Sequence, residues 1–225
     1  MIFIKTHKDF DLSKLNINKN QYDEFRIICR NELKDNYDIQ VIHDKNNFLN
    51  QWENLYGELT YHYYVYTHLN EFDDIIGFIQ YKRTFNENVL INYKELLEQY
   101  DVILPSPLKN FNIIEQFNNC HVSGLLEQMI DIIHEYYPEY HKANLYSIST
   151  LFPHNIFIMK KQDYIEYCKF MFWCYDMLNA KYNIYKELNN KKYFRILSFL
   201  GERISTYFYL IHFKRIAISN VPFEM

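Results

Sequence analysis

Hydrophobic positions fall into short apolar runs and longer helical stripes, which alternate through the first third of the chain. The apolar runs at 1–6, 39–44 and 75–81 are short and rich in Ile, Phe and Val, which is typical of buried strands. The segments 21–35 and 52–69 space their apolar residues three and four apart, which predicts helices. This order of elements predicts a strand–helix–strand–helix–strand opening and a mostly parallel sheet.

The rest of the chain has a more helical pattern. A helix over 92–100 is expected to lead into a strand at 101–105, which Pro105 and Pro107 end because proline cannot continue a ladder. Further on, the pattern predicts a strand at 154–161 and four helical segments: 123–137, 139–151, 163–179 and 191–215.

The last predicted helix carries an apolar stripe at steps of three and four residues. We expect this stripe to pack on the sheet. Its members are Phe194, Leu197, Leu200, Ile204, Phe208 and Ile211. Because no repeat, low-complexity linker or domain boundary interrupts the chain, we expect a single α/β domain over 1–225. It should have a mostly parallel central sheet flanked by helices and a helical C-terminal half.

Composition narrows the functional classes. The chain has 225 residues and a formal net charge of −4, and no cationic run reaches five residues, so nucleic acid is not expected as a partner. The four cysteines form no C-x-x-C pair, which indicates reduced thiols and a cytoplasmic protein. We expect no signal peptide and no transmembrane segment, and peripheral membrane association is left open. The sequence does not indicate an oligomeric state.

Polar and cationic residues follow several predicted strands. They are Thr6, His7 and Lys8 after the first, His43 and Asp44 after the second, and Gln80 to Arg83 after the third. The carboxyl ends of parallel strands share one rim, where α/β proteins bind ligands. Lysine and arginine together there suit a diphosphate. Gly77 would let a ring or backbone approach the sheet, and the chain has neither a P-loop nor a dinucleotide fingerprint.

Several segments, taken in order, resemble the DUF4422 family of glycosyltransferase-like proteins from capsular, exopolysaccharide and O-antigen clusters, which also has viral members. The similar segments are "THK" at 6–8, "ELTYHYYVYTHL" at 58–69, "DIIGFIQYKRTF" at 74–85, "DVILP" at 101–105, "PEY" at 138–140, "NIFI" at 155–158 and "RILSFLGERI" at 195–204. The resemblance implies a GT-A-like fold and transfer of a sugar from a nucleotide-diphosphate donor, with a UDP-sugar favoured, to a glycan acceptor. It places the protein in the cytoplasm, or in the host cytoplasm if the source is viral.

The resemblance also suggests roles for individual residues. The donor-binding set is Thr6, His7, Lys8, Glu58, Thr60, Gly77, Tyr81, Lys82 and Arg83, and the acceptor-binding set is His154, Asn155 and Arg203. For catalysis, Glu202 is the first candidate as the base that deprotonates an acceptor hydroxyl, and His121 follows. The alternative for Glu202 is a structural ion pair with Arg195 or a neighbouring loop.

The residues at the end of the third predicted strand indicate whether a metal ion is needed. Many GT-A enzymes place Asp-x-Asp at the end of a central strand, where this chain has Tyr81, Lys82 and Arg83. These cations could neutralise the leaving diphosphate directly, so no metal ligand and no tightly bound cofactor is assigned, although a divalent metal is left open. The literal "DFD" at 9–11 lies where a base or ribose would bind and is not favoured as a metal site.

One departure from the family pattern leaves functions other than sugar transfer open. The family usually has an acidic residue four positions after the mid-chain histidine, where this chain has Leu125. Leu125 favours the first alternative, a non-catalytic module that binds glycan or nucleotide. The second alternative is a structural protein that docks partners through its tyrosine-rich surface.

Overall fold

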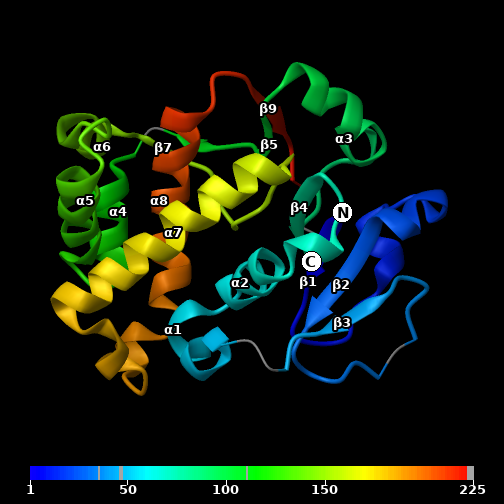
Figure 1. Cartoon of the computed structure of the whole chain (residues 1–225), viewed down its shortest axis with the longest axis horizontal. Coiled ribbons are helices and arrows are strands. Elements are labelled where there is room, and N and C mark those ends of the chain that lie inside the picture. The colour runs from blue at the N-terminus through cyan, green and yellow to red at the C-terminus, as the bar shows by residue number, and fades with distance from the viewer. Residues whose placement is uncertain (35, 46–47, 110, 222–225) are drawn as a thin grey trace.

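The computed structural model describes residues 1–34, 36–45, 48–109 and 111–221, and its centre is a seven-stranded sheet (Figure 1). The strand order is β3-β2-β1-β4-β8-β5-β9. β8 runs antiparallel to β4 and β5, and the other pairings are parallel, which confirms the mostly parallel sheet. The strands are β1 Ile2–Lys5, β2 Phe25–Cys29, β3 Val41–His43, β4 Ile75–Gln80, β5 Val102–Pro105, β8 Phe157–Lys160 and β9 Ile216–Ser219.

The helices lie mainly in the second half of the chain, as expected. They are α1 Glu53–Tyr56, α2 Leu59–Thr67, α3 Glu87–Gln99, α4 Ile113–Cys120, α5 Leu125–Tyr136, α6 Lys142–Ser147, α7 Lys161–Tyr182 and α8 Ile196–His212. A short ribbon pairs β6 Leu108–Lys109 with β7 Thr150–Leu151. Within the described residues, no helix is both long and apolar enough to cross a membrane.

The two faces of the sheet support separate cores because successive strand residues point to opposite sides. Phe3 and Phe78 face a large core shared with α2, α4, α5, α7 and α8. Ile4 and Ile79 face a smaller core closed by α3. In Figure 1, α4, α5 and α6 lie at the end of the molecule farthest from the seven-stranded sheet, α8 lies between them and the sheet, and α7 runs from the sheet side toward that end. The result is a three-layer α/β arrangement.

The predicted helix at 21–35 is wrong. The segment Lys19–Glu24 forms a 3₁₀ helix, and Phe25–Cys29 forms β2 between β1 and β3. Four of the five β2 residues are buried, so both faces of the strand are apolar, and such a run resembles one turn of an amphipathic helix. The chain therefore opens with three strands before its first α-helices, and residue 35 lies outside the described residues.

The helix predicted at 191–215 is too long. In the structure, α8 begins at Ile196 and ends at His212. Residues 216–219 form the edge strand β9, which the sequence did not predict. The helix that carries the stripe, α8, packs chiefly against α1 and α7 rather than on the seven-stranded sheet. Its four central members are buried, whereas Phe194 is 59% exposed and Ile211 is 40% exposed.

The strand register places the predicted ligand-binding segments on one rim. Lys5 lies opposite Ile28 and Gln80, and Cys29 lies opposite His43, so β1, β2, β3 and β4 end together. This confirms that Thr6–Lys8, His43–Asp44 and Gln80–Arg83 share a rim. Because β8 is antiparallel, its beginning lies there too, and it adds the preceding residues His154 and Asn155.

Candidate functional site

A cavity of about 560 Å³ opens at this rim of the sheet. Strand ends form one wall, the break between α1 and α2 forms another, and the start of α8 completes it. The lining residues are Lys5, Thr6, His7, Arg30, Asn31, Glu53, Gly57, Glu58, Tyr61, Gln80, Tyr81, Lys82, Arg83, Phe194 and Arg195. This size suits a ligand of several rings.

Most charged groups around the cavity are cationic. Lys82 is exposed at the end of β4, and the Arg83 guanidinium donates to the Gln80 amide oxygen at 2.9 Å. Arg30 forms an ion pair with Glu53 at the mouth. Burial lowers the pKa of His7, and the neighbouring Lys8, Arg195 and Lys82 lower it further. His7 is therefore held neutral at pH 7, and the lysines and arginines supply the positive field.

Two lysine side chains lie close to the ring of Tyr81. The Lys8 and Lys82 ammonium groups lie 5.8 and 5.5 Å from the ring centroid, within cation–π range. His7 meets the same ring edge-on at 5.3 Å. Lys8 does not line the cavity itself, but it lies beside the wall that Tyr81 forms. Two of the predicted donor-binding lysines are thus brought to one aromatic ring.

A buried polar cluster forms the floor of the cavity. Lys5, which is almost fully buried, donates from Nζ to the Asn155 carbonyl at 2.8 Å and lies 3.2 Å from the Glu58 carboxylate. Gln80 donates to the same carboxylate at 2.8 Å and to the His154 carbonyl at 3.0 Å. Strands β1 and β4 and the segment before β8 therefore meet at Glu58.

The charges of this cluster depend on one another. Burial acts to raise the pKa of Glu58, but Lys5 and Arg195 outweigh it, so the pKa lies below its usual value. Burial lowers the pKa of Lys5, and Glu58 opposes that shift. The buried His62 ring lies 3.2 Å from Lys5, and its pKa falls well below its usual value because of burial and this neighbouring cation. Glu58 is therefore ionised at neutral pH.

Gly57, between α1 and α2, leaves space for the Arg195 side chain. Gly57 has φ +53°, and a Cβ on it would lie 2.9 Å from the Arg195 Nε atom. The backbone of Arg195 donates to the Asn54 carbonyl at 2.6 Å. A side chain at position 57 would thus be strained and would push the Arg195 guanidinium aside.

The predicted donor-binding residues come together only in part. Six of them line the cavity: Thr6, His7, Glu58, Tyr81, Lys82 and Arg83. Thr60 is buried and its hydroxyl donates to the Gly57 carbonyl at 3.0 Å. Gly77 lies inside β4, where a Cβ would meet the side chains of Ile158 and Ile2 at 3.0 and 3.1 Å. Gly77 therefore makes room for side chains of the neighbouring strands and not for a ligand.

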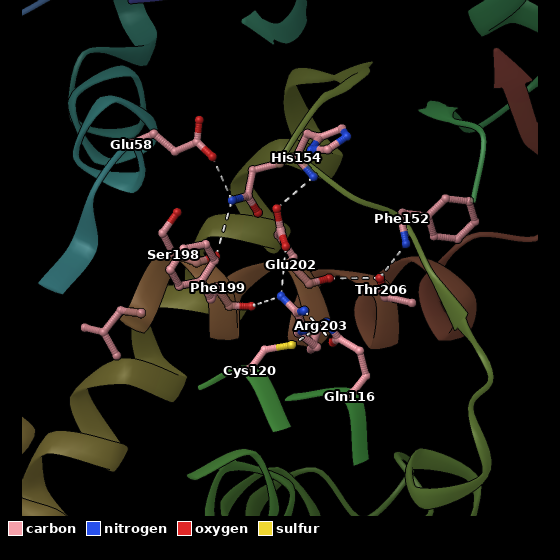
Figure 2. Close-up of polar contacts among 12 residues, drawn as sticks. Glu58, Gln116, Cys120, Phe152, His154, Ser198, Phe199, Glu202, Arg203 and Thr206 are labelled. Atoms are coloured by element: carbon pink, nitrogen blue, oxygen red, sulfur yellow. Dashed lines mark hydrogen bonds and ion pairs between the residues drawn. The ribbon is translucent and has the colours of Figure 1, made fainter. Parts of the chain in front are cut away.

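The structure does not bring Glu202 to the cavity wall, where we expected it. Its carboxylate accepts from the His154 amide at 2.9 Å and from the Arg203 guanidinium at 2.8 Å (Figure 2). Arg203 also donates to the Gln116 side chain at 2.7 Å, so it points away from the cavity. Glu202 does form an ion pair, with the adjacent Arg203 rather than with Arg195. Burial raises its pKa.

The other predicted residues of this region lie outside the cavity lining. His121 stacks on Phe199 at 4.3 Å between ring centroids, and burial together with Arg203 lowers its pKa to about 4. Burial also lowers the pKa of His154 to about 4, with Arg83 adding to the shift. Asn155 lies beneath the cavity and donates to Glu58 at 3.2 Å.

Several cavity residues were missed from the sequence. Lys5 ends an otherwise apolar strand, and this cation could have indicated a functional residue. Arg30 was hidden by the mistaken helix at 21–35. Arg195 and Phe194 lie at the start of α8, about 190 residues after β1, and no local pattern links them to the rim.

The acidic residues at 9–11 are engaged by the backbone. Asp11 accepts from the Ser13 amide and caps a 3₁₀ helix, Leu12–Leu15, while Asp9 accepts from the Lys34 amide at 2.8 Å. Across the described ranges, no group of three His, Cys, Asp or Glu side chains is arranged to hold a metal ion.

Comparisons with known proteins give a family and a fold. A family model described as a domain of unknown function, DUF4422, matches residues 1–212. No curated protein matches. A solved structure described as the apo structure of the bifunctional glycosyltransferase WbbM is similar, with a TM-score of 0.70 and 18% sequence identity. The match covers 99% of this chain and 45% of that one, so the chain spans less than half the length of its structural neighbour.

Proposed function

The chain belongs to the DUF4422 family, and on that premise we propose that it is a glycosyltransferase. It moves a sugar from a nucleotide-diphosphate donor, with a UDP-sugar favoured, to a glycan acceptor during assembly of a polysaccharide or of a glycoprotein glycan. The fold that it shares with a glycosyltransferase supports this proposal at the level of architecture.

The observation that carries the proposal is the distribution of charge around the cavity. Lys82 and Arg83 lie at the carboxyl end of β4, and Arg195, directly before α8, lines the same cavity. Such a site suits a diphosphate, because arginine presents a planar fork and lysine a point charge to phosphate oxygens. Tyr81, with its flanking lysines, offers a flat apolar surface next to that charge.

These residues suggest how the chain would assist sugar transfer. The diphosphate gains negative charge as the bond to the anomeric carbon breaks. Preorganised cations next to the leaving group therefore stabilise the transition state more than the ground state. In this proposal Lys82 and Arg83 perform that role, without a tightly bound cofactor and without an assigned metal ligand.

The acceptor would enter from the open side of the cavity. Phe194 lines the mouth with a largely exposed ring, and aromatic rings provide a flat apolar surface on which a sugar can lie. The cytoplasm, or the host cytoplasm for a viral source, is the proposed location because nucleotide sugars are the proposed donors.

A second candidate is a non-catalytic module that binds nucleotide or glycan. It is favoured by the fact that the predicted bases Glu202 and His121 do not line the cavity. Leu125, which stands where the family usually has an acid, is buried in the core at the start of α5.

A thermal-shift screen followed by an assay of donor hydrolysis separates these functions. The screen uses UDP, GDP and their common sugar conjugates, each with manganese and with chelator. A ligand at 100 times its dissociation constant should stabilise the protein by about 2.7 kcal/mol. Binding with slow release of free sugar supports the transferase, binding alone supports the module, and no binding contradicts both.

A further inference from the structure

Two carboxylates line the cavity, and they differ in depth. Glu53 lies at the mouth, where its side chain is 55% exposed and paired with Arg30. Glu58 lies on the floor, with its side chain 13% exposed and the buried Lys5 beside it. A buried, ionised carboxylate needs an explanation in a cavity proposed to hold an anionic diphosphate, because the two charges repel each other.

The hydrogen bonds of Glu58 are distributed unevenly between its two oxygens. Oε2 accepts from Gln80 at 2.8 Å and lies 3.2 Å from the Lys5 ammonium group. Oε1 accepts a longer bond, 3.2 Å, from the Asn155 amide. A carboxylate oxygen can accept about two hydrogen bonds, so Oε1 keeps capacity for another donor.

Asn155 supports Glu58 from outside the cavity lining. Its amide group donates to Oε1, and its own side-chain oxygen Oδ1 is buried out of reach of a ligand in the cavity. Glu58 Oε1 is therefore the acceptor that this cluster offers to a bound hydrogen-bond donor.

The charges around the cavity indicate where the diphosphate of the nucleotide sugar binds and where its sugar binds. Phosphate oxygens are acceptors and anions, so they match Lys82 and Arg83 and not Glu58. A sugar supplies neutral hydroxyl donors, which match the floor.

We propose that Glu58 binds the sugar of the donor by accepting a hydrogen bond from a sugar hydroxyl. Lys5 is its positioning residue. This inference rests on the proposed function, and it sets the direction of the donor: sugar toward the floor, diphosphate toward the β4 rim. The ligand class is a nucleoside diphosphate carrying a hydroxylated sugar.

The test compares two ligands by isothermal titration. UDP and the UDP-sugar that binds best among UDP-glucose, UDP-galactose and UDP-N-acetylglucosamine are titrated into the wild-type protein and into Glu58→Gln. The variant keeps the shape of the side chain and loses its charge. The ratio of the UDP dissociation constant to the UDP-sugar dissociation constant should fall about tenfold or more, as for loss of a charged hydrogen bond. The UDP affinity itself should not weaken, which also shows that the variant is folded.

Glu53→Gln is the matched control. It removes the other carboxylate of the same cavity, at the mouth. Both dissociation constants are free to change together, but their ratio should stay within about twofold of the wild-type ratio. An unchanged ratio in Glu58→Gln overturns the proposal, and so does an equal loss of ratio in both variants. If wild-type protein binds neither UDP nor any UDP-sugar, the proposed function fails instead.

A crystal structure of wild-type protein with the UDP-sugar gives a test that does not depend on the folding of a variant. A sugar hydroxyl should lie within hydrogen-bond distance of a Glu58 carboxylate oxygen. A bound sugar with no hydroxyl near Glu58 overturns the proposal.

Discussion

At the scale of single residues, the cavity combines cations that a ligand can reach with charges that the fold has buried. Lys82 is exposed at the rim, whereas Lys5 and Glu58 are held by hydrogen bonds on the floor. The rim cations could be predicted from the sequence because they follow strands, and Glu58 was expected at the donor site only through the family resemblance. The pairing of Lys5 with Glu58 joins residues 53 positions apart, and no local pattern encodes it.

Replacing Arg83 with alanine should weaken UDP binding. The guanidinium is expected to form charged hydrogen bonds with the diphosphate, and their loss should raise the dissociation constant about 10- to 100-fold. Arg215→Ala is the control, because Arg215 pairs with Asp101 near β9 and away from the cavity. Titration calorimetry measures both. Equal affinity of the two variants would exclude Arg83 from the diphosphate site.

Replacing Glu202 with glutamine should change the pH dependence of stability. Burial raises the pKa of Glu202 above the usual 4.5, so the folded state binds this proton more tightly than the unfolded state. Its contribution is full below pH 4.5 and is lost as the pH rises through the folded-state pKa. Glutamine does not titrate. The free energy of unfolding of the variant, relative to wild type, should therefore rise as the pH increases above 4.5.

Urea unfolding at a series of pH values measures this difference. A relative stability that stays flat or falls across this range would show that the folded protein does not raise the pKa of Glu202.

At the scale of elements, periodicity located most helices but misjudged the apolar runs at the edges of longer patterns. β2 is buried on both faces and lies between charged segments, so its five residues resemble one helical turn. β9 follows directly after the helix predicted at 191–215, and its partly exposed residues show too little contrast to predict a strand. In both cases the strand exists because a neighbouring strand supplies its hydrogen bonds, which sequence spacing does not report.

Close packing between helices makes Gly201 a sensitive position in α8. A Cβ there would lie 2.7 Å from the Tyr175 hydroxyl and 3.1 Å from a methyl group of Leu59. Gly201→Ala should therefore destabilise the protein by about 1–3 kcal/mol through overpacking. In a Tyr175→Phe background the cost should be smaller, because the clashing oxygen is gone.

Gly124→Ala provides the contrast. Gly124 has φ +82°, and no atom of the described residues lies within 4 Å of the position that an added Cβ would take, so its cost should come from backbone strain alone. The effects of Gly124→Ala and Tyr175→Phe should add. Chemical denaturation of the single variants and of the two double variants measures both couplings. Additive effects for Gly201→Ala and Tyr175→Phe would contradict the packing explanation.

At the scale of the whole molecule, the site is assembled from segments that are far apart in sequence. β1, β4, the α1–α2 break and the start of α8 meet around one cavity, so residues between 5 and 195 contribute to it. The mostly parallel sheet was predicted, and with it the rim shared by 6–8, 43–44 and 80–83, although the helix expected at 21–35 is replaced by the strand β2. The position of α8 could not, because tertiary packing sets it.

Nucleotide binding should depend little on divalent metal. The cavity presents lysine and arginine to a diphosphate, and its buried carboxylate Glu58 is already paired with Lys5. Adding chelator should change the UDP dissociation constant by less than about threefold, since charged side chains supply the main attraction. Titrations with manganese and with chelator compare the two conditions. Binding that requires manganese would contradict direct neutralisation by Lys82 and Arg83.

Photoaffinity labelling tests the central claim, that the strand-end cavity binds a nucleotide sugar, most directly. The protein is irradiated with 5-azido-UDP-glucose, with and without excess UDP, and the labelled peptides are mapped by mass spectrometry. We predict labelling that UDP suppresses in peptides that contain residues 6–7, 30–31 or 80–83, all of which line the cavity. Labelling that UDP does not suppress, or that maps to α4 and α5 instead, would contradict the account.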